Sequence, residues 1–163
     1  MNGREYWKIR PDLIELDGTT QQAAIGFLQP RSTDSRFVVR MEVLPATTSA
    51  QFVFGATGTG QTDFRAFAVI LDTTAPGRII DIRNRATMAE PSAAGRLHTD
   101  RANSAEVIVD GTNVVVRING LPVSQAQISE LTPGKIGIAA NLGTPDPTAA
   151  IRDVRLLKLP TMP

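Results

Sequence analysis

The clearest pattern in the chain is a strict alternation of apolar and polar residues in its last third. The stretches Ser104 to Asp110 (SAEVIVD) and Asn113 to Asn119 (NVVVRIN) both alternate with a period of two residues, which is typical of strands with one buried face. Because only two residues separate them, Asp110-Gly111-Thr112-Asn113 predicts a tight β-hairpin. A second turn at Asn119-Gly120 leads into a short strand from Leu121 to Val123.

The rest of the chain contains further short β-like segments, separated by residues that favour turns. We expect strands at Tyr6 to Arg10, Leu13 to Leu16, Ala23 to Leu28, Arg36 to Leu44, Ala50 to Ala56, Phe64 to Asp72, Arg78 to Asn84, Lys135 to Asn141 and Ala149 to Leu159. The range 86–101 is expected to be the one long irregular connection. No segment has a helical period beyond one short turn near Glu130. The pattern predicts an all-β protein, folded as a two-sheet antiparallel β-sandwich.

Length and charge limit the classes of protein that fit this pattern. With 163 residues, the chain is expected to form a single domain over 1–163. The proline-rich end and a strand-like segment close to Met1 suggest that this domain is cut from a longer protein. The 17 basic and 16 acidic residues are interspersed and give a net charge of +1, so nucleic acid is not an expected partner. No apolar run reaches the ~20 residues of a membrane span, so membrane insertion is not expected either.

Several segments, taken in order, resemble a known group of proteins. They are Trp7 to Ile9, Leu13 to Glu15, Phe37 to Val43, Phe52 to Gly55, Phe67 to Asp72, Val114 to Gly120, Gly134 to Ile138 and Ile151 to Leu156. Their order over nearly the whole chain resembles the concanavalin A-like lectin and glucanase superfamily. That superfamily includes laminin G-like domains and the 3-keto-disaccharide hydrolase-like family of multidomain bacterial proteins. The resemblance implies a jelly roll whose concave sheet forms a glycan groove.

The catalytic motifs of these relatives are incomplete in this chain. The glucanase motif Glu-x-Asp-x-x-Glu has its only similar string at Glu15-Leu16-Asp17, where the third carboxylate is missing. The hydrolase-like pattern Phe-x-x-Arg-x-Glu is matched by Arg40 and Glu42, but no glutamate precedes Asp72 on the later strand. By this resemblance, an enzyme would use Glu42 with Asp72 or Asp81 as its acid and base groups.

Alternation also predicts a polar binding cluster. If Phe37 and the alternate residues after it face the core, Arg40 and Glu42 emerge together on the opposite face. Arg65, Asp81 and Arg83 on later strands are expected to join them, and Asn119 in the hairpin is a further candidate. The predicted ligand-binding residues are therefore Arg40, Glu42, Arg65, Asp81, Arg83 and Asn119. The alternative for the strand residues is a solvated sheet face with cross-strand ion pairs, and for Asn119 it is a turn.

Other candidate residues have ordinary structural explanations beside their functional ones. The only indole, Trp7, and the only phenol, Tyr6, would either stack on a sugar ring or cover the edge of the core. His98 is the sole histidine, and a surface role is expected for it. Oxygen ligands for calcium would come from Asp63, Asp72 and Asp146, although no dense Asp/Asn loop surrounds them. No metal or other cofactor is therefore predicted beyond these calcium candidates.

The leading hypothesis is a noncatalytic lectin-like module that binds carbohydrate or another extracytoplasmic polymer, which places the protein outside the cytoplasm. The alternatives are a glycoside-processing hydrolase and a structural or protein-interaction domain. A groove that holds Arg40, Glu42 and a second carboxylate would favour the enzyme. An open polar platform would favour glycan binding, and a flat apolar patch would favour a protein partner.

Overall fold

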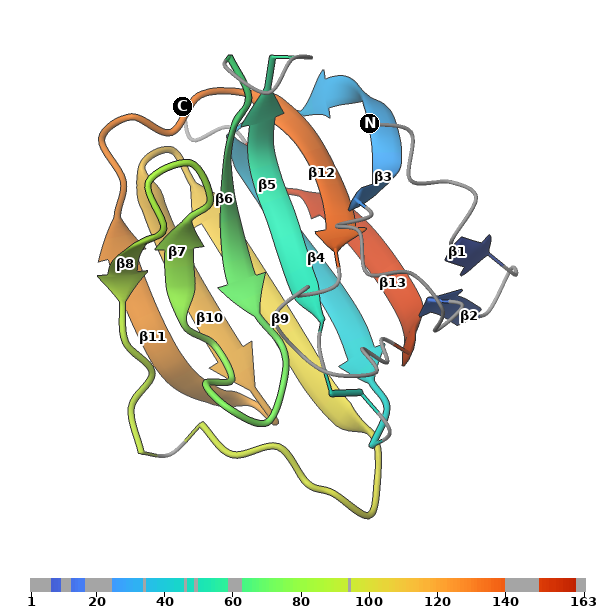
Figure 1. Ribbon diagram of the computed structural model, residues 1–163. Helices are drawn as coiled ribbons and strands as arrows, with labels where there is room; N and C mark the ends of the chain where they lie inside the picture. Colours follow the sequence, from blue (N-terminus) through green and yellow to red (C-terminus); the bar gives the residue numbers. More distant parts are fainter. Residues whose placement is uncertain are drawn as a thin grey trace.

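Thirteen β-strands form the regular structure of the described residues, in two stacked antiparallel sheets (Figure 1). The computed structural model describes residues 7–9, 13–16, 25–33, 35–45, 47–48, 50–58, 63–93, 95–139 and 150–160, with backbone alone in the first three ranges. None of these residues is helical, so the described part of the chain has no helix able to span a membrane. The predicted all-β sandwich is confirmed.

Each sheet combines strands from distant parts of the chain. The seven-stranded sheet has the spatial order β1 (Trp7–Ile9), β2 (Leu13–Leu16), β13 (Ala150–Lys158), β4 (Arg36–Val43), β9 (Asn103–Asp110), β10 (Asn113–Ile118) and β11 (Leu121–Gln127). The six-stranded sheet has the order β3 (Ile25–Thr33), β12 (Gly134–Ala139), β5 (Gln51–Thr57), β6 (Arg65–Ile70), β7 (Ile79–Asp81) and β8 (Ala86–Ala89). In Figure 1 most of the six-stranded sheet lies in front and the strands β9 to β11 lie behind it.

The two hairpins expected in the last third are present. Asp110 pairs with Asn113 across the first, and Gly111 has a φ of 62°. Asn119 and Gly120 connect β10 to β11 with φ values of 52° and 79°. Positive φ at both central residues is the requirement of a type I′ turn, whose twist matches that of the flanking strands. The turn residues therefore set the register of β9, β10 and β11.

The core lies between the sheets and follows the predicted alternation. Phe37, Val39, Met41 and Val43 of β4 are all buried, and they pack in one cluster with apolar residues of the other sheet. In that sheet, the ring centroids of Phe52 and Phe54 lie 6.1 Å apart, and Phe67 extends the aromatic group. The alternation in β4 thus identified the buried face correctly, and it places Arg40 and Glu42 on the outside.

Three strands differ from the expectation. Strand β8 (Ala86–Ala89) lies within the segment expected to be irregular, and its first three residues are exposed. It is an edge strand held by backbone pairing to β7, so its sequence needs no alternation. Strand β11 runs on to Gln127 past a bulge opposite Val116 and Arg117, which interrupts its period of two. Strand β3 continues through Pro30 to Thr33, beyond the expected end at Leu28.

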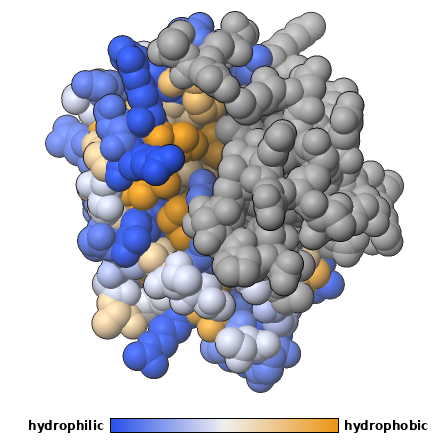
Figure 2. Space-filling view, in the orientation of Figure 1, coloured by the Kyte–Doolittle hydropathy of each residue, from blue (hydrophilic) through white to orange (hydrophobic). Residues whose placement is uncertain are grey.

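A second apolar cluster covers the outer face of the six-stranded sheet. Its buried members are Val53, Ala56, Ala66, Ala68 and Ala139, and Phe64, Ile80 and Ile82 pack against them. Val53 alternates with the core residues Phe52 and Phe54, which places this cluster on the side away from the core. Figure 2 shows hydrophobic residues in the middle of this face with hydrophilic residues beside them. The middle of this outer face is therefore apolar.

Candidate functional site

A pocket of about 280 Å³ opens at one end of the six-stranded sheet. It lies where β5 ends, β6 begins and the chain turns after β7, at the upper end of the sandwich in Figure 1. The connection from β11 to β12 supplies a further wall. Its lining consists of Gly55, Thr57, Arg65, Ala66, Phe67, Asp81, Arg83, Asn84, Glu130 and Thr132. Three of the six predicted ligand-binding residues therefore meet in one concavity.

Two glycines bring the walls of this pocket together. Gly55 has a φ of 61°, at a register shift between Phe54 and Thr57 of β5. A Cβ atom on Gly134 would lie 2.5 Å from the carbonyl carbon of Gly55, so only glycine permits this approach of β12 to β5. Leu131 is buried against the same bulge, and its neighbours Glu130 and Thr132 are thereby held at the pocket.

The carboxylate of Asp81 shapes the pocket through hydrogen bonds to the turn after β7. Its Oδ1 accepts from the backbone N–H groups of Arg83, at 2.9 Å, and Asn84, at 3.3 Å. Its Oδ2 accepts from Nδ2 of Asn84 at 2.8 Å. Both oxygens are thus engaged, as is typical of an aspartate that caps a turn. Asp81 positions Arg83 and Asn84, which leaves it poorly suited to act as an acid or base.

The charged groups of the pocket are otherwise uncommitted. Arg65, Arg83 and Glu130 are exposed, and none of them has an ion-pair partner among the described residues. Thr57 and Thr132 add two hydroxyl groups, and Phe67 adds a mostly buried ring. Guanidinium groups donate in a planar fork that suits carboxylates, and they also hydrogen-bond hydroxyl oxygens. The pocket therefore offers guanidinium donors, one carboxylate acceptor and two hydroxyl groups that can donate or accept to a small polar ligand.

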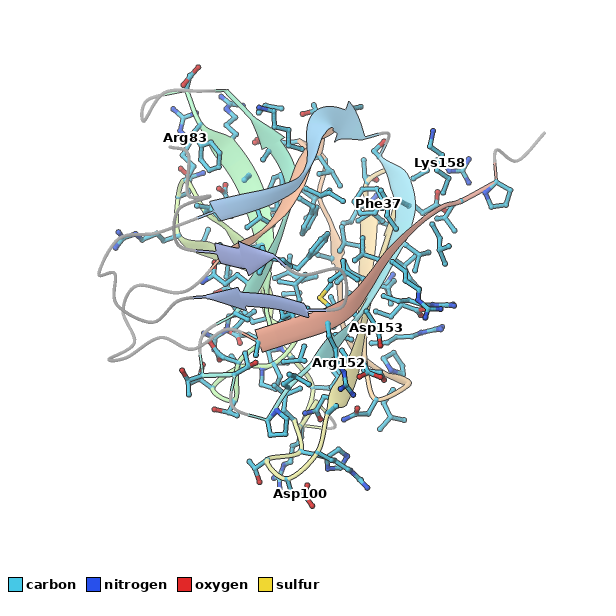
Figure 3. All side chains as sticks on the ribbon, turned by 90° about the vertical axis from the view of Figure 1, so that its right-hand side faces the viewer. Phe37, Arg83, Asp100, Arg152, Asp153 and Lys158 are labelled. Carbon is cyan, nitrogen blue, oxygen red and sulfur yellow. The ribbon has the colours of Figure 1, made fainter. Side chains whose placement is uncertain are left out.

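Arg40 and Glu42 are not part of this pocket. Both lie on β4, in the seven-stranded sheet, whereas Arg65 and Asp81 lie in the six-stranded sheet. Figure 3 shows the sandwich from the side, with Arg83 on the six-stranded sheet and Arg152 on the other. The single cluster expected from the sequence is not formed. Alternation tells which residues of one strand share a face, but strand pairing decides which sheet that strand joins.

On the outer face of β4 the two residues form cross-strand ion pairs. Nε of Arg40 donates to Oε2 of Glu106 at 2.6 Å, and Nε of Arg152 donates to Oε2 of Glu42 at 2.6 Å. The hydrogen bond and the negative charge of Glu42 raise the pKa of Arg152 above its ordinary value. These contacts agree with the alternative of a solvated sheet face with ion pairs.

Asn119 serves the second hairpin. Its Oδ1 accepts from the backbone N–H of Ser104 at 3.0 Å, and its Nδ2 donates to Oδ1 of Asn103 at 3.0 Å. With its positive φ, this residue both makes the turn and ties it to β9. These hydrogen bonds support the turn role, which was the alternative to ligand binding, and the role of Asn119 as a ligand contact stays a prediction.

The three carboxylates predicted for an enzyme occupy three different places. Glu42 lies on the seven-stranded sheet, Asp81 pairs with Phe67 near the start of β6, and Asp72 follows the other end of β6. Asp72 comes five residues after Phe67, which in extended chain is a rise of roughly 17 Å. Asp72 is buried and accepts hydrogen bonds from the backbone N–H and the hydroxyl of Thr74. Glycosidase carboxylate pairs lie roughly 5–10 Å apart, so these residues do not form one.

Comparison with solved structures identifies the fold. The model matches the carbohydrate-binding module CBM66 from Bacillus subtilis with a TM-score of 0.69 and 11% identity, over 93% of this chain and 91% of that chain. A Bacillus subtilis protein with a galectin-like fold matches with a TM-score of 0.66 and 16% identity, over 93% and 80%. A Bacillus licheniformis β-glucanase matches with a TM-score of 0.62 and 14% identity, over 96% and 84%. The chain has the concanavalin A-like jelly-roll fold.

The jelly roll covers nearly the whole chain in each of these matches, as the resemblance in the sequence predicts. At the level of sequence, no family model and no curated protein matches the chain. The similarity to laminin G-like domains and to 3-keto-disaccharide hydrolases stays a prediction. What the matches establish is the architecture, because identities of 11–16% carry no residue roles.

The calcium candidates do not converge in this jelly roll. Asp63 precedes β6 and Asp72 follows it, so the length of the strand separates them. Asp146 lies outside the described residues. Within the ranges that the structure describes, no three His, Asp or Glu side chains are grouped as metal ligands. These residues therefore give no geometric support to a shared calcium site.

The aromatic and histidine candidates have separate outcomes. Tyr6 lies outside the described residues, and Trp7 is described only as backbone of β1. Nε2 of His98 lies 2.9 Å from Nη2 of Arg101, and its backbone N–H donates to Oδ1 of the buried Asn103 at 2.7 Å. His98 thus belongs to a loop anchored by Asn103, in agreement with the expected surface role.

Glu130 and Thr132 are among the pocket residues that were not identified from the sequence. They belong to the connection between β11 and β12, where a short turn was expected at Glu130, and Leu131 does donate its N–H to the carbonyl of Ile128. The available signal was the apolar Leu131 between two polar neighbours, because burial of the middle residue directs both neighbours outward. Their approach to Arg65 depends on the packing of the two sheets.

Proposed function

We propose that this protein is a noncatalytic carbohydrate-binding module that takes a terminal or short glycan unit into the pocket at the end of the six-stranded sheet. The observation that carries the proposal is the convergence of Arg65, Arg83 and Glu130 on one concavity of about 280 Å³. An extracytoplasmic location is part of the proposal.

The chemistry of the pocket suits a sugar. A sugar offers several hydroxyl groups that both donate and accept, and the pocket supplies two arginine donors, a carboxylate acceptor and two threonine hydroxyls. The pocket volume of about 280 Å³ lies just below the roughly 300–1,000 Å³ typical of ligand pockets, which suits a small ligand such as a terminal sugar. The small apolar lining at Phe67 and Ala66 can contact the C–H face of a ring.

One observation favours binding over catalysis. Asp81 uses both carboxylate oxygens to hold its own turn, which leaves Glu130 as the uncommitted carboxylate of the pocket. A retaining or inverting glycosidase requires two available carboxyl groups. The solved structures that share this jelly roll include both a carbohydrate-binding module and a β-glucanase, so they support a carbohydrate ligand without separating the two functions.

A glycan array followed by calorimetry on the best ligand tests the proposal. Arg83→Ala and Arg65→Ala are each expected to weaken binding by at least about tenfold, because each removes charge-assisted hydrogen bonds worth roughly 1.5–3 kcal/mol. Arg96→Ala is the matched control, since this exposed arginine lies in a loop and does not line the pocket. The proposal fails if no glycan binds above background, or if the control variant weakens binding as much as the pocket variants do.

Turnover measurements on glycosides and keto-glycosides separate the module from the hydrolase. The expected result is no product with the wild type at any concentration that saturates binding. If the wild type forms product and Glu130→Gln does not, the protein is an enzyme that uses this pocket and the binding-module proposal is wrong.

A further inference from the structure

The outer face of the seven-stranded sheet carries its side chains in rows that cross the strands, because antiparallel pairing sets residues opposite one another. The first row contains Arg152, Glu42 and Ser104. The second, here called the arginine row, contains Arg155, Arg40, Glu106 and Arg117. The third contains Leu157, Val38, Ile108 and Val115, and the fourth contains Arg36 and Asp110.

Among these rows, positive charge is in excess only in the arginine row. Arg152 is paired with Glu42, and Arg36 lies 2.8 Å from Asp110, although its Nε is not aligned for a hydrogen bond. In the arginine row, by contrast, a single carboxylate serves two guanidinium groups. Glu106 accepts from Arg40 at 2.6 Å and from Arg117 at 3.3 Å.

Arg155 adds a further positive charge to this row. It stands directly opposite Arg40 and has no ion-pair partner among the described residues. Three positive groups against one negative group leave an excess of two charges. Like charges directly opposite each other are destabilising in an antiparallel sheet, so this arrangement costs stability without a partner.

A strained residue puts Arg155 into the row. Arg152 and Arg155 are three residues apart, so a regular strand would place them on opposite faces. The register of β13 shifts between them, and Asp153 has a φ of 52°, in the left-handed region. The resulting bulge sets Arg152 opposite Glu42 and Arg155 opposite Arg40, with both arginines exposed. Figure 3 shows Asp153 beside Arg152 on β13. Backbone strain of this kind persists where the surrounding structure imposes it, and it is enriched at functional sites.

The guanidinium groups of the row are available to a ligand. The side chains of Arg40 and Arg117 are 61% and 47% exposed, whereas Glu106 between them is only 18% exposed. Arg40 uses Nε and Arg117 uses Nη1 for Glu106, so each retains N–H groups that no other described residue binds. The surface therefore presents arginine donors above a carboxylate that is largely covered.

The geometry of the row selects the kind of ligand. Neighbouring strands are roughly 5 Å apart, so Arg155 and Arg40 are separated by that distance and Arg40 and Arg117 by roughly 10 Å. A flat row of this kind fits an extended chain with regularly spaced anions. The described residues of the four rows include no aromatic side chain, which single-stranded nucleic acids use for base stacking. The neighbouring apolar row, with Leu157 at 44% exposure, can contact the C–H faces of sugar rings.

We propose that the arginine row binds an acidic polysaccharide, through carboxylate or sulfate groups held by Arg155, Arg40 and Arg117. This site lies on the opposite sheet from the pocket of Arg65 and Arg83 and is independent of it. The guanidinium fork matches both kinds of anion, and the attraction weakens as salt concentration rises.

The test is binding of the full chain to polygalacturonate, which carries carboxylates, and to dextran sulfate, with neutral dextran as the reference. At least one polyanion is expected to bind, with an affinity that falls as salt rises. Arg155→Ala is expected to weaken that binding roughly tenfold and to lower the salt slope by about one. Because Arg155 has no ion-pair partner among the described residues, this variant is expected to fold as stably as the wild type.

Two further variants separate this site from general effects of charge. Arg96→Ala removes an exposed arginine from a loop and is expected to leave polyanion binding within twofold of the wild type. Glu106→Gln removes the one negative charge of the row and is expected to strengthen binding.

Three results would overturn the proposal. One is that neither polyanion binds better than neutral dextran, and another is that Arg155→Ala and Arg96→Ala weaken binding equally. The third is binding to vesicles of equimolar phosphatidylcholine and phosphatidylserine without binding to either polysaccharide, which would assign the row to a membrane surface.

Discussion

The pocket at the end of the six-stranded sheet and the arginine row on the seven-stranded sheet use the same side chain in opposite settings. In the pocket, Arg65 and Arg83 come from a strand start and a turn, and they converge with Glu130 around a hollow. In the row, the arginines come from the middle of paired strands and stand side by side on a flat face. Loops can converge on a small ligand, whereas strand register produces parallel arrays suited to a long one.

The two regions also depend on different features of the backbone. The pocket requires the close approach of Gly134 to Gly55, and the row requires the bulge at Asp153. Each feature is local to its own region, so a substitution that damages one is expected to leave the other intact. Substitutions in one region, with stability and both binding activities measured, therefore test whether the two regions are independent.

Gly134→Ala is expected to have the largest effect, and to act on the pocket. The added Cβ would lie 2.5 Å from the carbonyl carbon of Gly55 and 2.7 Å from the backbone nitrogen of Ala56, which cannot give way as a side chain can. We expect the free energy of unfolding to fall by roughly 3 kcal/mol and glycan binding to be lost. Chemical denaturation and calorimetry measure both effects.

Gly111→Ala is the matched control for this substitution. Gly111 also has a positive φ, of 62°, but an added Cβ would have no neighbour within 4 Å. The expected loss is roughly 1–2 kcal/mol, from the left-handed conformation alone, with both binding activities retained. Equal losses for the two glycines would contradict the close approach of β12 to β5.

Glu106→Ala is expected to act on the stability of the row. This substitution leaves Arg40 and Arg117 without their shared carboxylate, so we expect a loss of roughly 1–2 kcal/mol that shrinks at high salt. Glu130→Ala in the pocket is expected to change stability by less than about 0.5 kcal/mol, because Glu130 is exposed. If Glu130→Ala lowered the free energy of unfolding more than Glu106→Ala, then Glu130 would be the glutamate that stabilises the fold.

Asn119→Gly tests whether Asn119 belongs to the hairpin. Glycine keeps the positive φ but removes the side-chain hydrogen bonds to Ser104 and Asn103. We expect a loss of roughly 1 kcal/mol in the free energy of unfolding, with glycan and polyanion binding unchanged. Weaker glycan binding at full stability would return Asn119 to the list of ligand contacts.

Asp153→Gly is expected to have the smallest effect on stability. Glycine relieves the left-handed strain at φ 52°, which stabilises the folded state. Glycine also gives the unfolded chain more conformational entropy, which opposes this effect. We therefore expect the free energy of unfolding to rise by between zero and roughly 1 kcal/mol. Binding to the pocket is expected to be unchanged in the same protein. A marked loss of stability would mean that the Asp153 side chain, and not its backbone, holds the bulge.

Much of the fold was predictable from local patterns, whereas only part of the pocket was, namely Arg65, Asp81 and Arg83. The alternation in β4, β9 and β10 and the turn residues Gly111 and Asn119 identified strands, buried faces and hairpins correctly. Strand β8 escaped prediction because it is held by backbone pairing at an edge, where side chains need no pattern. The grouping of Arg40 with Arg65 failed because period two says nothing about which sheet a strand enters.

By itself, the sequence determined the class of the fold. Apolar alternation at period two selects half-buried strands, and Gly and Asn at tight turns set the register, so both are decided by neighbours along the chain. Tertiary structure alone decided which charged residues meet. Crossovers between the sheets separate Glu42 from Asp81, bring Glu130 to Arg83, and set Arg155 opposite Arg40. These pairings arise from the packing of distant strands, which no local pattern encodes.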